Sequence, residues 1–101
     1  MGYYAVIFTS LRTDIDTNEY SEMSQKMVAK TKTQKGFLGV DSARGSDGVG
    51  ITISYWDSLE NIKAWKNDDE HLNAQELGRQ KWYESFSVRI CKVEHEYGSE
   101  K

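Results

Sequence analysis

A run near the start of the chain, Tyr3 to Arg12, constrains the fold most. It reads YYAVIFTSLR and is nearly continuous in apolar and β-branched side chains, a pattern typical of a β-strand. Because neighbouring side chains of a strand point to opposite faces of its sheet, a strand that is apolar throughout needs cover on both faces. A layer of helices covers one face. A second copy of the chain, stacked sheet to sheet, would cover the other.

Helical and strand patterns alternate along the rest of the chain. Tyr20, Met23 and Met27 recur at helical spacing, which predicts a helix over residues 18–33 that Gly36 ends. The later predicted elements are a strand over 37–44, a hairpin turn over 45–48, a strand over 50–56, a helix opening at Asp57, a helix over 70–81 and a strand over 85–96. This order, β-α-β-β-α-(α)-β, predicts an α+β, ferredoxin-like fold with one antiparallel sheet and helices on one face.

Further details are expected of these elements. Asp57 followed by Glu60 predicts a capping box at the start of a helix. Cys91 is expected to be buried in the last strand, and Val93 breaks the alternation of that strand, which predicts a bulge or an edge that pairs elsewhere. Gly78 falls inside a helical pattern, where glycine costs about 1 kcal/mol relative to alanine. That cost indicates close packing or a close ligand at this position.

Composition and charge exclude several classes of partner. Charged residues make up 29% of the chain, and the formal net charge is -3. Lysines and arginines are scattered between acids, which argues against a nucleic-acid partner because such binding usually requires a basic face. No apolar run approaches the roughly 20 residues that span a bilayer, so no membrane partner is expected. His71 and His95 lack the spacing and the carboxylate of a metal site.

Length and cysteine content bound the architecture. The 101 residues fit one domain, placed at residues 1–97, with a polar tail at 98–101. Cys91 is the only cysteine, so no intrachain disulfide forms. The N-terminus lacks the basic region of a secretion signal, and a cytoplasmic location is the expectation.

The stretch from Tyr55 to Tyr83 holds all three tryptophans and one of the two histidines. His71, Gln75 and Arg79 are spaced four residues apart, so a continuous helix would place them on one face. His71 titrates near neutral pH, which makes it the candidate general base or axial ligand. The same histidine is equally typical of a satisfied residue at the start of a helix.

The other polar and aromatic residues of this stretch also admit two interpretations. Arg79 has the fork that suits a planar anion, but an ion pair with Glu76 or Glu84 is favoured. Each tryptophan alone is typical of a core, whereas together they indicate an aromatic-lined pocket. The residues predicted to bind a ligand there are Tyr55, Trp65, Gln75 and Trp82.

Two segments of the chain resemble the antibiotic biosynthesis monooxygenase superfamily. They are the run from Ile51 through Trp65, and AWKNDDEHLNAQELGRQKWY followed by a strand with Arg89 and Val93. The second segment resembles a stress-type branch of it. The resemblance implies a small dimeric α/β barrel, a homodimer in which two sheets face each other. It also implies a pocket in each subunit between the sheet and its helices.

The resemblance implies two chemistries, which particular residues separate. Some members oxidise polyketide-like aromatics with oxygen and no metal, flavin or haem, and others bind and degrade haem. Haem-degrading members use an asparagine on the first strand, a tryptophan that Trp65 matches, and a histidine further along the helical region. The first strand offers Phe8 or Thr9, and the histidine position falls at Gln75, one turn after His71. Haem degradation is therefore the disfavoured alternative.

The sequence predicts a cofactor-independent monooxygenase that acts on a small planar aromatic, a quinol or a polyketide-like compound. His71 and Arg79 are the predicted catalytic residues, with no metal and no cofactor. The predicted partners are a second copy of the chain and the aromatic ligand. The alternative is a non-catalytic small-ligand-binding or stress-response protein of the same fold, and a filled core around Trp65 and His71 would favour it.

Overall fold

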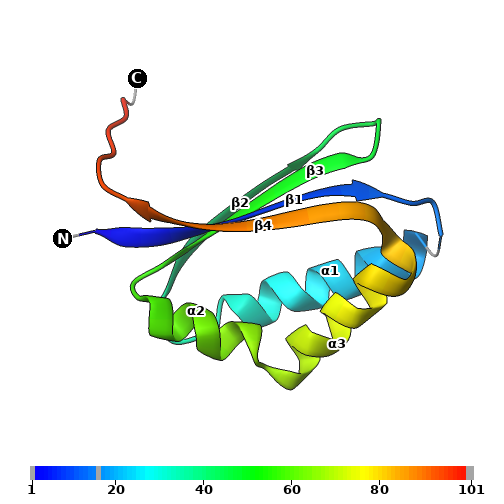
Figure 1. The fold of residues 1–101 in the computed structure, drawn as a ribbon, viewed down its shortest axis with the longest axis horizontal. Coiled ribbons are helices and arrows are strands. Elements are labelled where there is room, and N and C mark those ends of the chain that lie inside the picture. Colours follow the sequence, from blue (N-terminus) through cyan, green and yellow to red (C-terminus); the bar gives the residue numbers. More distant parts are fainter. Residues whose placement is uncertain (1, 16, 100–101) are drawn as a thin grey trace.

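One antiparallel sheet of four strands, with helices packed on one of its faces, makes up the described chain (Figure 1). The computed structural model describes residues 2–15 and 17–99. Within them the elements are β1 Tyr3–Arg12, α1 Thr17–Thr31, β2 Phe37–Arg44, β3 Val49–Trp56, α2 Leu59–Lys66, α3 Asp69–Leu77, a π-helical turn Gly78–Trp82 and β4 Tyr83–Val93. This order confirms the predicted α+β, ferredoxin-like fold.

The strand order is β2-β3-β1-β4, so β1 lies inside the sheet between β3 and β4. In this register Tyr4 lies opposite Trp56 on β3 and Lys92 on β4. Directly opposed residues point to the same face, so the even-numbered residues share one face over most of these three strands. The buried Trp56 marks this even face as the one that the helices cover.

The core between the sheet and the helices is built around Trp56, which is fully buried. It packs with Ile62 and Trp65 of α2. The partly buried residues packed against this cluster are Tyr4, Val6, Met27 and Phe37. The indole N–H of Trp56 donates to Ser54 Oγ at 2.9 Å, so its buried polar atom is satisfied. Burying each large apolar side chain stabilises the fold by about 1.5–3 kcal/mol, which fixes α2 on the sheet.

Two glycines with positive φ close the turns that the sequence predicts. Gly36 (φ 83°) follows α1, and Gly48 (φ 90°) lies in the β2–β3 hairpin. This left-handed region suits glycine, because a side chain there is strained. A Cβ at Gly36 would also clash with Asn61, so this glycine lets the α1–β2 connection approach α2.

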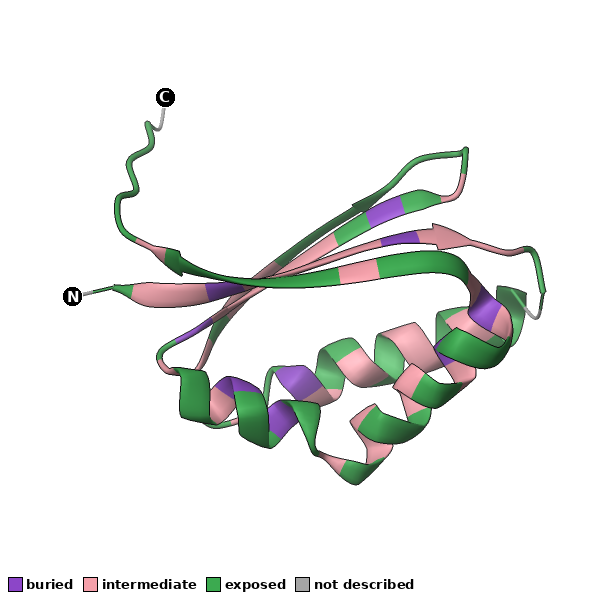
Figure 2. Cartoon of the chain, in the orientation of Figure 1, coloured by how far each residue is buried: buried purple, intermediate pink, exposed green. Residues whose placement is uncertain are grey.

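The odd-numbered face of the sheet is apolar, and no helix of the described chain covers it. Ile7 of β1 lies opposite Ile53 of β3 there, while Val49 and Ile51 are 44% and 43% exposed. The C-terminal segment rises from this side (Figure 1), and Figure 2 shows β4 exposed along most of its length. In the single chain the second face of the sheet is thus uncovered. This is the face for which the apolar first strand predicts a cover.

The first turn of α2 corrects the predicted capping box. Its N-cap is Ser58, whose hydroxyl accepts the backbone N–H of Asn61 at 3.2 Å. The predicted cap, Asp57, still belongs to the strand connection, because its backbone N–H donates to the Gly36 carbonyl at 2.9 Å. The helix therefore begins one residue later, at a residue type that caps equally well.

The edge strand β4 corrects two predictions about the last strand. Cys91 is exposed, because it lies opposite Ala5 on the uncovered face of the sheet. Val93 pairs in register with Tyr3, so its apolar side chain belongs to the uncovered face and does not mark a bulge. The register shift of this strand pair lies at its other end, after Leu11.

The residues after β4 form no helix or strand up to residue 99. His95 is exposed, as predicted, and Tyr97 is 100% exposed. Residues 100 and 101 of the predicted polar tail lie outside the described residues. No helix in the described part of the chain is long and apolar enough to cross a membrane. The domain bounds 1–97 and the cytoplasmic location stay predictions.

Candidate functional site

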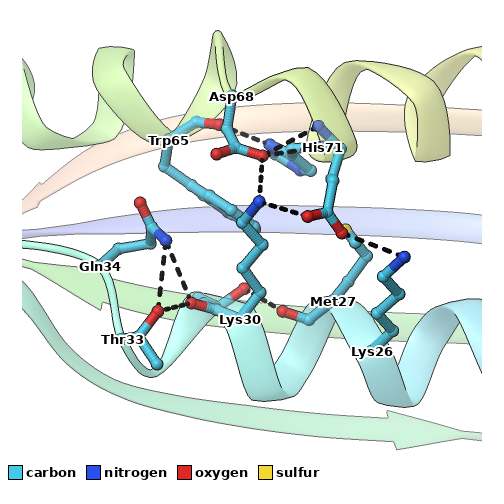
Figure 3. Close-up of polar contacts among 10 residues, drawn as sticks. Lys26, Met27, Lys30, Thr33, Gln34, Trp65, Asp68 and His71 are labelled. Atoms are coloured by element: carbon cyan, nitrogen blue, oxygen red, sulfur yellow. Dashed lines mark hydrogen bonds and ion pairs between the residues drawn. The ribbon is translucent and has the colours of Figure 1, made fainter.

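Trp65 and His71 meet where α2 is followed by α3, on the helix-facing side of the sheet (Figure 3). Asp68 caps α3, because its carboxylate accepts the backbone N–H groups of Glu70 at 3.0 Å and His71 at 3.2 Å. The two rings stack with their centroids 4.2 Å apart and an interplanar angle of 8°. A helix cap thus brings together two residues that the sequence singles out.

The hydrogen bond of His71 fixes where its proton lies. Nδ1 lies 2.9 Å from the carbonyl oxygen of Trp65. Because a carbonyl oxygen only accepts, Nδ1 carries the hydrogen and Nε2 is the bare nitrogen of the neutral ring. Burial lowers the pKa of His71, although the Trp65 carbonyl and the Asp68 carboxylate act in the opposite direction. At neutral pH His71 is therefore a neutral imidazole, and Nε2 has no partner among residues 2–15 and 17–99.

Two lysines of α1 hold the start of α3 through ion pairs. Lys30 donates to Glu70 Oε1 at 2.8 Å and lies 3.1 Å from Asp68 Oδ1. Lys26 lies 3.1 Å from Glu70 Oε2, and Lys30 and Lys26 together lower the pKa of Glu70. Burial raises the pKa of Asp68, but hydrogen bonds from Lys30 and the backbone of His71 outweigh it, so the net shift is downward. Both carboxylates are thus ionised and engaged at neutral pH.

The described residues contain no group of three histidine, cysteine, aspartate or glutamate side chains that could hold a metal ion. The acidic pair at the start of α3, Asp68 and Glu70, is occupied by the lysines of α1. The arrangement around His71 is therefore that of a positioned neutral base beside an aromatic ring.

Trp82 lies in the π-helical turn, beyond the end of α3 that is remote from His71. It is 2% exposed, and its ring lies edge-to-face against Tyr20 at 5.6 Å. Its indole N–H is buried without an acceptor in the described part of the chain. Gln75 is partly buried on α3, one helical turn after His71. The structure therefore associates Gln75 with the His71 end of α3 and Trp82 with a different cluster.

The predicted helix over this region is interrupted. α3 ends before Gly78, and a π-helical turn follows in which the N–H of Tyr83 donates to the Gly78 carbonyl. A Cβ on Gly78 would lie 2.8 Å from the Tyr83 ring, so the glycine marks close packing. Beyond α3, the side chain of Arg79 is 55% exposed and its guanidinium lies 3.5 Å from the Glu76 carboxylate. The structure therefore shows Arg79 in the ion pair that the sequence favours.

Tyr55 lies on the opposite face of the sheet from Trp65 and His71. Its hydroxyl donates to the Asp41 carboxylate at 3.0 Å, and this hydrogen bond, with a smaller effect of burial, raises the pKa of Tyr55. Strand alternation already implies this placement, because Tyr55 and Trp56 are neighbours on β3 and point to opposite faces. The structure thus separates Tyr55 from the other residues predicted to bind a ligand.

A stripe of apolar side chains on β4 faces the helices but stays exposed. The β4 stripe consists of Phe86, Val88 and Ile90, of which 44%, 52% and 49% is exposed. These residues lie opposite even-numbered residues of β1, on the same side of the sheet as His71. Their alternation predicts the strand, but not that an edge strand leaves its helix-facing side open. The β4 stripe is apolar surface available to a ligand.

Two open hollows lie at the chain ends and on the uncovered face. One of about 360 Å³ lies between residues 2–3 and 93–96, and one of about 430 Å³ has Tyr55 and Asp41 in its wall. Trp65 and His71 line neither hollow, and their stacked rings are in direct contact. This filled arrangement favours the predicted alternative, a non-catalytic protein of the same fold.

The sequence of the chain falls within a known family. A sequence model of the monooxygenase af470-like family matches residues 9–97. A relative, "Uncharacterized protein YqjZ" of Bacillus subtilis (strain 168), is 50% identical over 94 residues, which cover 93% of this chain and 82% of the relative. The chain belongs to the monooxygenase af470-like family.

Solved structures share the fold. Rv0793 from Mycobacterium tuberculosis is 13% identical with a TM-score of 0.82, over 95% of this chain and 99% of that chain. A crystal structure of an antibiotic biosynthesis monooxygenase is 13% identical with a TM-score of 0.78, over 89% of this chain and 97% of that chain. Together with the family match, this likeness confirms the resemblance to the antibiotic biosynthesis monooxygenase superfamily. The stress-type branch stays a prediction.

Proposed function

We propose that the chain is a cofactor-independent monooxygenase acting on a small planar aromatic, a quinol or a polyketide-like compound. The observation that carries the proposal is the state of His71, whose Nδ1–H is held by the Trp65 carbonyl while burial keeps the ring neutral. A neutral imidazole with one N–H fixed is the form that accepts a proton from a bound substrate. Membership of the monooxygenase af470-like family supports this reaction class.

In the proposed reaction His71 is the base and molecular oxygen is the oxidant. Nε2 takes a proton from an activated C–H of the substrate, and the resulting anion passes one electron to oxygen. The two radicals combine to a hydroperoxide at that carbon, which loses water and leaves a carbonyl group. One CH2 group and one O2 are consumed, and one C=O group and one H2O are formed. The exposed β4 stripe holds the flat substrate beside the stacked pair of His71 and Trp65.

The remaining predicted residues differ in their support. Gln75 shares α3 with His71, and we assign it a hydrogen bond to the substrate. We assign Trp82 to the part of the substrate-binding region that lies farthest from His71. Arg79 stabilises the substrate anion only after leaving Glu76, and Tyr55 acts from the other face of the sheet. Both are therefore secondary in the proposal.

Oxygen uptake by the purified protein tests the reaction. With anthrone as the substrate, the wild type should consume one O2 per molecule and form anthraquinone, because the CH2 group of anthrone becomes a carbonyl group. His71→Asn keeps a side-chain donor near Nδ1 but removes the base, so uptake should fall by about 10²-fold or more. His95→Gln changes an exposed histidine and should behave as wild type. Absence of oxygen uptake with every quinol and anthrone tested would end the proposal.

The second candidate is a small-ligand-binding protein without chemistry. The direct stacking of Trp65 on His71 argues against catalysis at His71, because no hollow lies between these rings, and the exposed β4 stripe would then be the binding surface. Titration with the same aromatics should then quench tryptophan fluorescence while oxygen uptake stays at the level of buffer. Haem binding is the weaker alternative, because Gln75 stands where the haem-handling histidine is expected. A Soret band on adding haem that is lost in His71→Ala would support it.

We infer that two chains pair through their uncovered faces into a homodimer. The support is the apolar character of this face, where Val49 and Ile51 remain more than two-fifths exposed in the single chain. Ile53→Arg would bury a charge in the pairing surface, so sedimentation should show a monomer for this variant and a dimer for the wild type. Glu60→Lys changes an exposed residue of α2 and should leave the dimer intact. A monomeric wild type at micromolar concentration would contradict the pairing.

A further inference from the structure

Two arginines converge on Tyr20 at the end of the sheet remote from Trp65. The guanidinium of Arg44 reaches over from β2, and Nη2 donates to Ser10 Oγ at 3.0 Å and to the Tyr20 hydroxyl at 3.2 Å. The guanidinium carbon of Arg12 lies 3.8 Å from the centre of the Tyr20 ring. Residues 24 and 34 positions apart along the chain are thus brought together by the strand register and by α1.

A glycine makes room for the Arg44 side chain. Arg44 lies directly opposite Gly50 in the β2–β3 pair, and Gly50 is buried. A Cβ on Gly50 would clash with the guanidinium of Arg44, so any larger residue would displace it. The glycine lets Arg44 lie across β3 and reach Ser10 on β1, which is only 3% exposed. The arginine is therefore held in a built position on the helix-facing side of the sheet.

The positive charge of these arginines is not neutralised by the described residues. Neither Arg12 nor Arg44 has a carboxylate within ion-pair distance among residues 2–15 and 17–99. Glu19, next to Tyr20 in sequence, instead lies 3.1 Å from Lys81. The planar guanidinium fork matches the two oxygens of a carboxylate. Two guanidinium groups without a carboxylate partner among the described residues therefore favour an anionic ligand.

The tyrosines add hydrogen-bond donors beside these charges. The hydroxyl of Tyr83 donates to that of Tyr20 at 3.3 Å. Burial, together with the Tyr20 hydroxyl, raises the pKa of Tyr83, so its phenol keeps its proton at neutral pH. The hydroxyl hydrogen of Tyr20 then has no acceptor in the described part of the chain. The guanidinium groups and the Tyr20 hydroxyl thus supply donors, which suits a ligand that accepts hydrogen bonds.

An apolar wall adjoins the donors. The Tyr83 ring lies edge-to-face against Phe8 at 5.3 Å, and Phe86 lies 5.8 Å from Phe8. Phe86 is 44% exposed and begins the β4 stripe. A ligand whose anionic group meets the arginines can therefore lay an aromatic body on this wall.

We propose that this cluster, the Arg44 end, binds an organic carboxylate with an aromatic body. The Arg44 end consists of Ser10, Arg12, Tyr20, Arg44, Gly50 and Tyr83. The carboxylate lies against Arg44 and Arg12, and the aromatic ring lies on Phe8 and Phe86. The binding site lies apart from Trp65 and His71, and it stands whether or not the chain consumes oxygen.

Calorimetry with three small molecules tests the chemical class of the ligand. 2-Naphthoate should bind saturably, whereas 2-naphthamide, which has the same ring but no charge, should bind at least tenfold more weakly. Inorganic phosphate has the charge without the ring and should also bind at least tenfold more weakly. Equal binding of acid and amide, phosphate binding as tight as that of naphthoate, or absence of naphthoate binding at millimolar concentration would each overturn the proposal.

Variants test the location. Arg44→Gln and Gly50→Ala should each weaken naphthoate binding at least tenfold, the first by removing the charge and the second by displacing it. Arg89→Gln is the matched control, because Arg89 lies on the other face beside Ser87 and its loss should change nothing. Wild-type binding by folded Arg44→Gln would overturn the assignment.

Chemical-shift mapping on the wild type decides the location without any substitution. Naphthoate should shift the amide signals of Ser10, Arg12 and Arg44 most. Shifts centred on Trp65 and His71 would instead assign the ligand to the other end of the sheet and overturn the proposal, even if a variant failed to fold.

Discussion

The two ends of the helix-facing side handle charge in opposite ways. The Trp65 end consists of Trp65, His71, Asp68, Glu70 and Lys30. There the cation of Lys30 meets two carboxylates, and the stacked His71 ring is neutral. At the Arg44 end two guanidinium groups surround a tyrosine, and no carboxylate of the described chain lies within ion-pair distance of either. The charged side chains of the Trp65 end are paired with one another, whereas the guanidinium groups of the Arg44 end are available to an anionic ligand.

This difference separates a packing role from a binding role. The ion pairs of the Trp65 end join α1 to α3, so they stabilise the docking of two helices. The guanidinium groups of the Arg44 end join neutral oxygens, including the Trp82 carbonyl at 2.7 Å from Arg12. Unbalanced charge of one sign disfavours the compact state unless a ligand offsets it. We therefore expect substitutions of the ion-paired residues at the Trp65 end to act mainly on stability, and those of the arginines at the Arg44 end mainly on ligand binding.

The largest effect is expected from removing the central aromatic residue of each end. Trp65→Ala removes a ring that is 7% exposed and should lower the free energy of unfolding by about 3–5 kcal/mol. Tyr20→Ala should cost about 1–2 kcal/mol, because Tyr20 is only partly buried. Urea unfolding followed by circular dichroism measures both changes. Equal losses would show that the two ends contribute alike to the core and would break the comparison.

A smaller effect is expected from the cation that closes the Trp65 end. Lys30→Met leaves Asp68, whose side chain is 22% exposed, without its lysine. The free energy of unfolding should fall by less than for Trp65→Ala but by more than for Lys26→Met, since Lys30 meets two carboxylates and hydrogen bonds to charged groups contribute more than neutral ones. The same urea titration measures the loss, and it should shrink when Asp68 is also changed to Asn. A loss that persists in the double variant would show that Lys30 acts through packing of its stem.

The fold follows from the sequence more directly than the site does. The bounds of Tyr3–Arg12 and Phe37–Arg44 agree with the predicted strands, because alternation and glycine turns are local signals. The predicted helix over 70–81 remains helical, but it changes from an α-helix to a π-helical turn after Leu77, where the Tyr83 ring packs against Gly78. Such a contact joins two elements, and residue periodicity within one element does not encode it.

The Arg44 end illustrates why the proposed carboxylate site could not be predicted from the sequence. Arg44 and Ser10 are 34 residues apart and belong to strands that are not neighbours, so only the register of β3 between them brings them together. One signal was present in the sequence. Gly50 lies inside a predicted strand, where glycine often marks the close approach of another group. Arg44 lies on the other strand of the same predicted hairpin, so it was a candidate for the group that approaches Gly50.

The pH dependence of stability should reveal the neutral histidine of the Trp65 end. The pKa of His71 is lower in the folded state than its unfolded value of about 6.5, so the unfolded state takes up the proton first as pH falls. The stabilisation is present above that value and is lost as pH falls through the folded pKa. Urea unfolding at pH 7.5 and 5.5 should therefore show a loss for the wild type.

Two histidine variants serve as controls for this pH effect. His71→Asn should show a smaller loss between the same pH values, whereas His95→Gln should match the wild type because His95 is exposed. The lowered pKa values of Asp68 and Glu70 act in a separate window, below about pH 4. A wild type whose stability does not change from pH 7.5 to 5.5 would mean that His71 binds its proton equally well in both states.

The smallest effect is expected from Lys26, which pairs with the same Glu70 as Lys30 but in water. The side chains of this pair are 62% and 45% exposed, so solvent and salt screen the attraction. Lys26→Met should change the free energy of unfolding by about 0.5 kcal/mol or less, and 0.5 M salt should remove the difference. A loss as large as that of Lys30→Met would show that total charge, not the burial of one lysine between two carboxylates, closes the Trp65 end. The contrast between these two lysines therefore decides whether burial is what distinguishes the Trp65 end from the Arg44 end.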